Sequence, residues 1–111
     1  MNIRALPPIR FVEKLPSGGR NAIGIYYFDT VYVTTKPTYT SKLEVLIHEL
    51  GHYIHREYFG DKQFRFSTEG KGKYANKNCR ENFAECFTEL IYYGEDTERT
   101  RKMIKILEEI I

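Results

Sequence analysis

The chain has 111 residues, of which 17 are basic and 15 acidic, and its formal net charge is +2. This length predicts one domain, spanning residues 1–111, with a single hydrophobic core. The near-neutral charge gives no electrostatic reason to expect a nucleic acid or an anionic membrane as partner. No apolar run approaches the roughly 20 residues that cross a bilayer. With no signal peptide visible, we expect a cytoplasmic location; secretion by another route and the oligomeric state stay open.

The first third of the chain has the composition of a small β-sheet. A weakly alternating run covers residues 11–15, and runs rich in aromatic and β-branched residues cover 22–28 and 31–35. Asp29 and Thr30 separate the last two runs, which predicts a tight antiparallel hairpin.

A long amphipathic helix is expected over residues 42–58. Ser41 and Glu44 have the spacing of a capping box, in which both side chains satisfy free amide groups at a helix start. Gly60 supplies the stop signal. The apolar residues that recur at helical spacing are Leu43, Leu46, Ile47, Leu50 and Ile54.

Two further helices are expected after a polar, glycine-containing stretch. Asn78 can cap one over residues 79–93, which Gly94 would end. Asp96 can cap another over about 97–110. The fold class is therefore α+β: a small, mostly antiparallel sheet with a hairpin, followed by three helices.

The two cysteines, Cys79 and Cys86, lie seven residues apart on the same expected helix. That spacing separates their Cα atoms by about 10 Å, which is beyond the reach of a disulfide. We expect reduced thiols, as is usual in the cytoplasm.

His48-Glu49-Leu50-Gly51-His52 is an H-E-x-x-H sequence inside the first expected helix. Residues four apart share one helix face, so both imidazoles can bind one ion at about 2.1 Å. A Zn²⁺ ion held there lowers the pKa of a water ligand, and Glu49 can act as the general base. The alternative is a chance pair of surface histidines beside a glutamate.

His55, the third histidine, is excluded as a ligand to the same ion. It lies seven residues from His48, about 10 Å along the helix axis. We expect it to be a polar residue at the edge of the cleft or packed against the following loop.

A catalytic zinc needs a third protein ligand, and no histidine remains to supply it. Glu81, Glu85 and Glu89 recur along one side of the second helix and are the candidates. Glu81 can instead complete a capping box with Asn78, and the others can form a solvated stripe. If one of them binds zinc, its neighbour can accept the free N–H of a ligating histidine.

The H-E-x-x-H sequence, followed by Glu-Asn-Phe-Ala-Glu-Cys-Phe at 81–87, resembles the gluzincin metallopeptidases. The resemblance is greatest to the catalytic domain of anthrax lethal factor and to the Pro-Pro endopeptidases. It implies a minimal zincin-like domain with Glu81 as the third zinc ligand and Glu85 as a carboxylate that supports a ligand without binding the metal. It also implies that Tyr74 stabilises the oxyanion; core packing is the alternative for this tyrosine.

The resulting expectation is a zinc endopeptidase that binds a protein or peptide substrate extended along an edge strand, with residues 23–28 as that strand. The segment 61–77 is either a lid or a simple connector. Two alternatives remain. One is a cytosolic regulatory metallopeptidase of the repressor-cleaving type with few targets. The other is a non-catalytic zinc-binding interaction domain.

Overall fold

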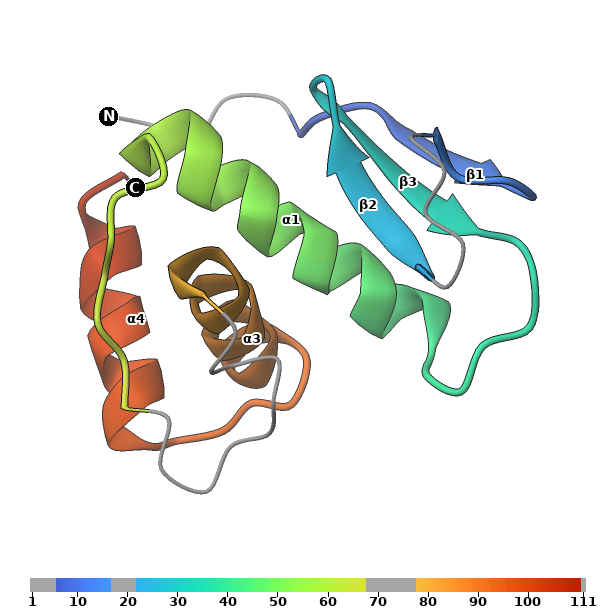
Figure 1. Ribbon diagram of the computed structural model, residues 1–111. Helices are drawn as coiled ribbons and strands as arrows, with labels where there is room; N and C mark the ends of the chain where they lie inside the picture. The colour runs from blue at the N-terminus through green and yellow to red at the C-terminus, as the bar shows by residue number, and fades with distance from the viewer. Residues whose placement is uncertain (1–5, 17–21, 68–77, 111) are drawn as a thin grey trace.

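The computed structural model describes residues 6–16, 22–67 and 78–110 (Figure 1). Three strands precede three helices in the described chain, which confirms the α+β class. The elements are β1 (Ile9–Val12), β2 (Gly24–Tyr27), β3 (Thr30–Thr34), α1 (Lys42–Phe59), α3 (Cys79–Ile91) and α4 (Glu98–Glu108).

The strands form one sheet in the order β1-β3-β2, so β2 is an edge strand. β2 and β3 form the expected antiparallel hairpin. The expectation of a mostly antiparallel sheet is wrong for β1, which begins at Ile9 and pairs with β3 in parallel. Parallel pairing needs a long connection, and 17 residues, including β2, separate β1 from β3. Local sequence patterns do not show whether two such distant strands pair in parallel.

The hairpin turns one residue earlier than the sequence predicts. Tyr27 pairs with Thr30, so Phe28 and Asp29 form the two-residue turn. Their φ angles are 43° and 64°. Positive φ at both central positions matches the right-handed twist of the strands, although Phe rarely adopts it. Neither turn residue is a glycine, so the sequence pattern places the turn one residue too late.

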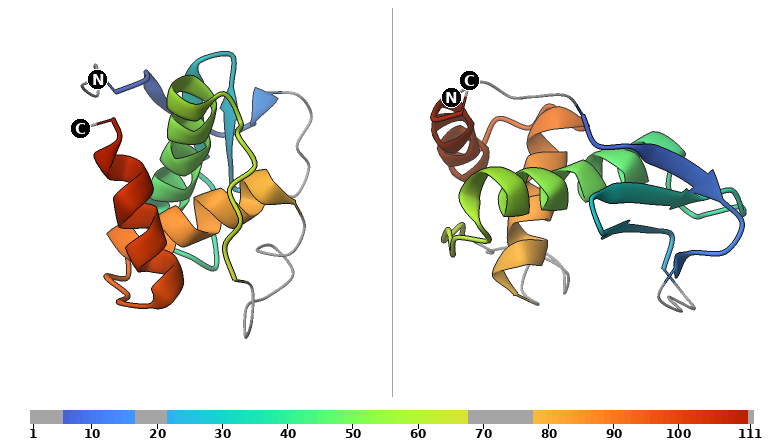
Figure 2. Two further views of the ribbon diagram at one scale, coloured as in Figure 1. Left: turned by 90° about the vertical axis from the view of Figure 1, so that its left-hand side faces the viewer. Right: turned by 90° about the horizontal axis from the view of Figure 1, so that it is seen from above.

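α1 is the central element of the fold. It lies between the sheet and the pair formed by α3 and α4, and α3 crosses it steeply (Figures 1 and 2). Val45 packs into a cluster with Val31 and Val33 of the sheet. Leu50 contacts this cluster and also the larger helical one. The buried members of the helical cluster are Phe66, Phe83, Cys86, Phe87, Met103, Ile106, Leu107 and Ile110.

The bounds of α1 agree with the prediction to within one residue, but the Glu44 carboxylate, expected to complete the capping box, accepts a hydrogen bond from the Thr40 hydroxyl instead. The Ser41 side chain accepts a hydrogen bond from the Glu44 N–H, and Gly60, with a φ of 57°, closes the helix. The cap of α4 differs from the expectation, because Thr97 rather than Asp96 occupies the N-cap and forms a capping box with Thr100.

Residues 61–67 follow α1 and pack against the helices. Phe66 is 6% exposed, and its carbonyl accepts a hydrogen bond from the Asn82 side chain. This part of the 61–77 segment, for which both a lid and a simple connector were open, is therefore anchored to the core. The remainder, 68–77, lies outside the described residues.

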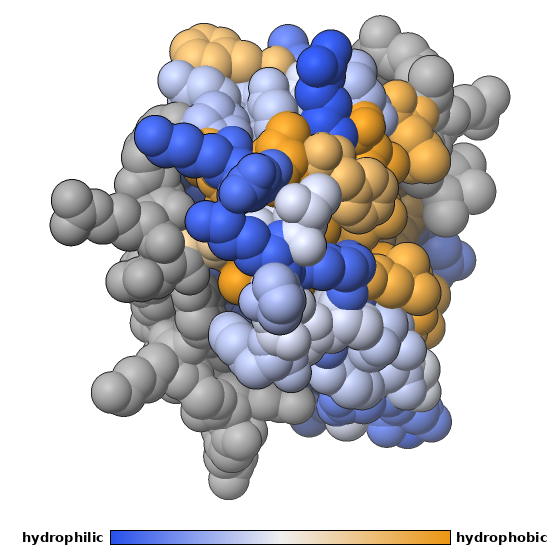
Figure 3. All heavy atoms as spheres, turned by 90° about the vertical axis from the view of Figure 1, so that its right-hand side faces the viewer, coloured by the Kyte–Doolittle hydropathy of each residue, from blue (hydrophilic) through white to orange (hydrophobic). Residues whose placement is uncertain are grey.

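Apolar and charged side chains are mixed at the end of the molecule that carries the sheet (Figure 3). Phe11 and Phe28 are among its exposed apolar residues. Within 6–16, 22–67 and 78–110, no helix has the length and apolar character needed to cross a bilayer.

Candidate metal centre and its groove

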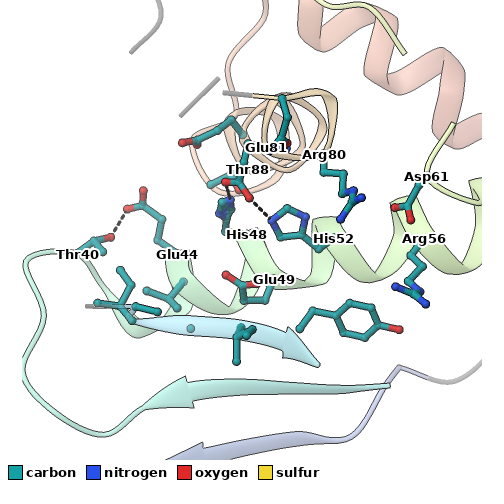
Figure 4. Close-up of a pocket in the computed structure, with 18 of the residues that line it drawn as sticks. Thr40, Glu44, His48, Glu49, His52, Arg56, Asp61, Arg80, Glu81 and Thr88 are labelled. Carbon is teal, nitrogen blue, oxygen red and sulfur yellow. Dashed lines mark hydrogen bonds and ion pairs between the residues drawn. The ribbon is translucent and has the colours of Figure 1, made fainter. Parts of the chain in front are cut away.

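One face of α1 presents two imidazoles to α3. His48 and His52 are one turn apart, and their ring centroids are separated by 5.0 Å. The Nε2 atom of His52 lies 2.9 Å from one carboxylate oxygen of Glu81, and the Nε2 atom of His48 lies 3.5 Å from the other. Three side chains from two helices thus converge on one point (Figure 4).

Glu81 is placed there by the start of α3. The Asn78 side chain accepts a hydrogen bond of 2.8 Å from the Glu81 N–H, which fixes the first turn of the helix. The Glu81 backbone therefore serves the helix cap while its carboxylate faces the histidines. Of the capping box that the sequence offers as the alternative, the structure shows the Asn78 half, while the Glu81 carboxylate lies against the histidines.

The donor atoms of His48, His52 and Glu81 all lie within 4.8 Å of one another. Two imidazole nitrogens and one carboxylate oxygen are the donor set of catalytic zinc sites, which leave a fourth position open. The residues present therefore fit a zinc ion.

The two imidazoles have different pKa values in the metal-free protein. Burial and the neighbouring His52 lower the pKa of His48 to about 4. Burial also opposes the charged form of His52, but the Glu81 hydrogen bond and the charges of Glu49 and Glu81 raise its pKa above the ordinary value. Without metal, a proton on His52 therefore offsets the Glu81 charge, and a bound cation would replace that proton.

Glu49 lies between the histidines and the edge strand. Its carboxylate accepts a hydrogen bond from the Tyr26 backbone N–H on β2, and burial raises its pKa to about 7. Gly24 makes this approach possible, because a Cβ atom there would lie 2.5 Å from a Val45 methyl and 3.2 Å from the Glu49 side chain. A general base works best with a pKa near the working pH.

Gly51 has a role that sequence analysis missed. A Cβ atom at this position would lie 3.1 Å from the Cα atom of Ala84. The missing side chain lets α3 cross α1 closely between the two histidines, which brings Glu81 within reach of them. A glycine inside the H-E-x-x-H motif indicates that another element comes close to the helix there. The sequence does not show that this element is α3.

A cavity of about 650 Å³ contains these groups. β2 forms one wall, and the exposed faces of α1 and α3 form the others. The Thr34 N–H donates to the Ile23 carbonyl, so Ile23 points its backbone groups toward β3. Successive residues of a strand point these groups to opposite sides, so those of Gly24 and Tyr26 point away from β3. The predicted edge strand thus presents main-chain groups at the candidate metal centre.

Glu85 lines the same cavity one turn along α3 from Glu81. Burial, with the charges of Glu81 and Glu89, raises its pKa. Its expected hydrogen bond to a ligating histidine stays a prediction. Tyr74, the expected oxyanion donor, lies outside the described residues.

His55 faces away from this group. Its ring is fully buried, stacks on Phe83 at 4.4 Å and hydrogen-bonds the Lys62 carbonyl through Nε2 at 2.7 Å. The loop that follows α1 is therefore its partner, which is one of the two expected roles.

Comparisons with protein-family models, with curated proteins and with solved structures return no match for this chain.

Proposed function

We propose that the protein is a zinc-dependent endopeptidase. The observation that carries this proposal is the convergence of His48, His52 and Glu81 within 4.8 Å, beside a half-buried glutamate and an edge strand. A His–Glu cluster with a purely structural role would need neither a general base nor a substrate-sized cavity beside it. The presence of both favours a catalytic role.

Zn²⁺ held by His48, His52 and Glu81 would polarise the scissile carbonyl and acidify the attacking water. Glu49 accepts the proton of that water on its carboxylate and passes it to the nitrogen of the departing amine. Its hydrogen bond to the Tyr26 N–H fixes the carboxylate at the level of the edge strand. β2 aligns the peptide through main-chain hydrogen bonds, and Tyr74 is the proposed oxyanion donor.

The regulatory alternative uses the same residues and differs in substrate range: a cytoplasmic enzyme of that type acts on one or few protein targets. Cys79 and Cys86 are both free thiols, which is compatible with the cytoplasmic location that the sequence predicts. A non-catalytic zinc-binding domain would keep the metal but cleave nothing.

The test combines zinc content with peptide cleavage. Glu49→Gln should retain zinc and lose cleavage by about 10²-fold or more, because only the proton acceptor is removed. Glu81→Ala should lose zinc and activity together, whereas Glu108→Ala, the same change at an exposed site on α4, should lose neither. Full cleavage by Glu49→Gln would contradict the mechanism. Zinc loss mainly with Glu85→Ala would contradict the ligand assignment.

A further inference from the structure

The candidate metal centre lies midway between an acidic and a basic residue of α1. Glu44, His48, His52 and Arg56 are each four residues apart, so they follow one face of the helix. All four line the cavity. Figure 4 shows Glu44 on one side of the two histidines and Arg56 on the other.

α3 repeats this order of charges. Arg80 also lines the cavity, and Figure 4 shows it on the Arg56 side of the two histidines. Glu85 lines the cavity one turn along α3 from Glu81, and the charge of Glu44 adds to burial and to the charges of Glu81 and Glu89 in raising its pKa. The cavity is therefore acidic at one end and basic at the other.

Other groups at each end modify this pattern without reversing it. At the acidic end, the Glu44 carboxylate accepts hydrogen bonds from the hydroxyls of Thr40 and Tyr93, which are neutral donors. At the basic end, Asp61 lines the cavity, and its carboxylate lies 3.8 Å from the His55 Nδ1 atom. Among the residues that line the cavity at this end, one carboxylate faces two guanidinium groups, so the lining is net positive. Glu57 and Asp29, which accept hydrogen bonds from the Tyr26 hydroxyl, are not part of the lining.

The direction of β2 relates these ends to the direction of a bound peptide. Gly24, at the start of the strand, packs against Val45, and the Tyr26 hydroxyl donates to Glu57 at 2.9 Å. β2 and α1 therefore run the same way (Figure 4). A peptide added antiparallel to β2, the more stable pairing, enters with its amino-terminal part at the Arg56 end.

The spacing sets the length of peptide that can reach both ends. Glu44 and Arg56 are twelve residues apart, or about 18 Å along the helix. An extended peptide covers that distance in about five to six residues. With the scissile bond at the centre, each charged end faces the second or third residue on its side.

We propose that the groove selects peptides that carry an acidic residue two or three positions before the scissile bond and a basic residue two or three positions after it. Arg56 and Arg80 receive the acidic side chain, and Glu44 and Glu85 receive the basic one. This inference rests on the proposed endopeptidase activity and names its substrate class.

Three eight-residue peptides test the proposal. The first has Asp before and Lys after the central bond, the second has these two residues exchanged, and the third has Gln at both positions. We expect kcat/KM to be highest for the first peptide, lower for the Gln peptide and lowest for the exchanged peptide, with about threefold to tenfold per step at low salt and smaller differences at high salt. Equal rates, or a preference for the exchanged peptide, would overturn the proposal.

Arg56→Glu should abolish or reverse the preference for an acidic residue before the scissile bond. Lys105→Glu makes the same charge change on the exposed face of α4 and should alter no preference. An unchanged preference in Arg56→Glu would contradict the role of this end.

A binding measurement separates this inference from the proposed function. The zinc-loaded Glu49→Gln variant should bind the first peptide more tightly than the exchanged one, by fluorescence anisotropy. Cleavage without charge preference would contradict the inference alone. Charge-ordered binding with no cleavage by the unmodified protein would contradict the enzymatic function alone, and the absence of both would contradict both.

Discussion

Gly51 and Ala84 bring the backbones of α1 and α3 together between the two histidines. A Cβ atom on Gly51 would lie 3.1 Å from the Ala84 Cα and 3.2 Å from the Phe87 ring. The Cα atom of Ala84 cannot rotate away, so any added group must move α3 itself. The distance between Glu81 and the histidines therefore depends on Gly51, although Gly51 has no side chain that could bind a metal.

Gly51→Ala should weaken zinc binding by about tenfold, the range found when supports of metal ligands are altered. Overpacking costs about 1–3 kcal/mol, and the better helix propensity of alanine returns up to about 1 kcal/mol, so the loss of folding stability should be small. Titration with a competing chelator measures the affinity.

A variant of similar stability controls for this change. Ile106→Val removes one methyl from the helical core, away from the metal centre, at a cost of about 1 kcal/mol. It should leave the zinc affinity unchanged. If both variants bind zinc as the unmodified protein does, the crossing at Gly51 does not position Glu81.

Removal of metal should lower the melting temperature, because a ligand that binds only the folded state adds about 2.7 kcal/mol at 100 times its Kd. The effect should shrink as the pH falls from 8 to 5, since zinc must displace the proton that His52 holds with a raised pKa. Thermal unfolding with and without chelator measures it. Glu81→Ala should show no difference at either pH, and a pH-independent difference in the unmodified protein would contradict the assignment.

Glu49 should make the metal-free protein less stable as the pH rises. Its pKa is about 7 in the folded state against 4.5 for an ordinary glutamate, so between these values the folded state holds a proton that the unfolded chain has released. The free energy of unfolding therefore falls with increasing pH through this window.

Glu49→Gln cannot titrate, but its amide oxygen can still accept the Tyr26 N–H. Relative to the unmodified protein, the variant should gain up to about 3 kcal/mol between pH 4 and pH 8, from a shift of about 2.5 pH units. Urea unfolding of both metal-free proteins at the two pH values measures this. A stability difference that does not change with pH would show that Glu49 is not held neutral by burial.

Arg99 joins α4 to α3 and to the segment after α1. It is 5% exposed and donates to both carboxylate oxygens of Glu89, at 2.8 and 3.1 Å. It also donates to the Asn82 side chain at 2.9 Å and to the Ser67 carbonyl. Asn82 follows Glu81 directly in α3, so this network holds the start of that helix.

Arg99→Met should reduce the free energy of unfolding by about 3–5 kcal/mol, because it leaves the Glu89 charge buried without its partner. Arg99→Met combined with Glu89→Gln should recover much of that loss, since no charge then remains buried. Chemical unfolding measures both. A double variant as unstable as the single one would indicate that the contacts to Asn82 and Ser67, not the ion pair, provide the stability.

The parts of the fold that depend on local patterns are predictable from the sequence. Ser41 and Asn78 cap the helices to which they were assigned, and the spacing of His48 and His52 defines their shared face. The position of Glu81 beside them was expected only from the resemblance to gluzincins, because it depends on how two helices cross.

The parts that depend on distant contacts are not predictable in this way. Neither Gly24 nor Gly51 has a special φ angle that a turn pattern would reveal; each is required because another element lies against it. The parallel pairing of β1 and the turn at Phe28 have the same origin, since tertiary packing outweighs weak local preferences at both places.

The central place of α1 has a consequence for local unfolding. The sheet and the α3–α4 pair both pack on this helix, with Leu50 shared between their two hydrophobic clusters. Among the described residues, the small cluster under the sheet has only Val31, Val33 and Val45 as buried members, so the hairpin should detach at a lower free energy than the helices separate. Amide hydrogens of β2 and β3 should then exchange faster than those of α1. A peptide added to β2 would slow that exchange, so protection of the hairpin would report substrate binding even in a protein that cannot cleave.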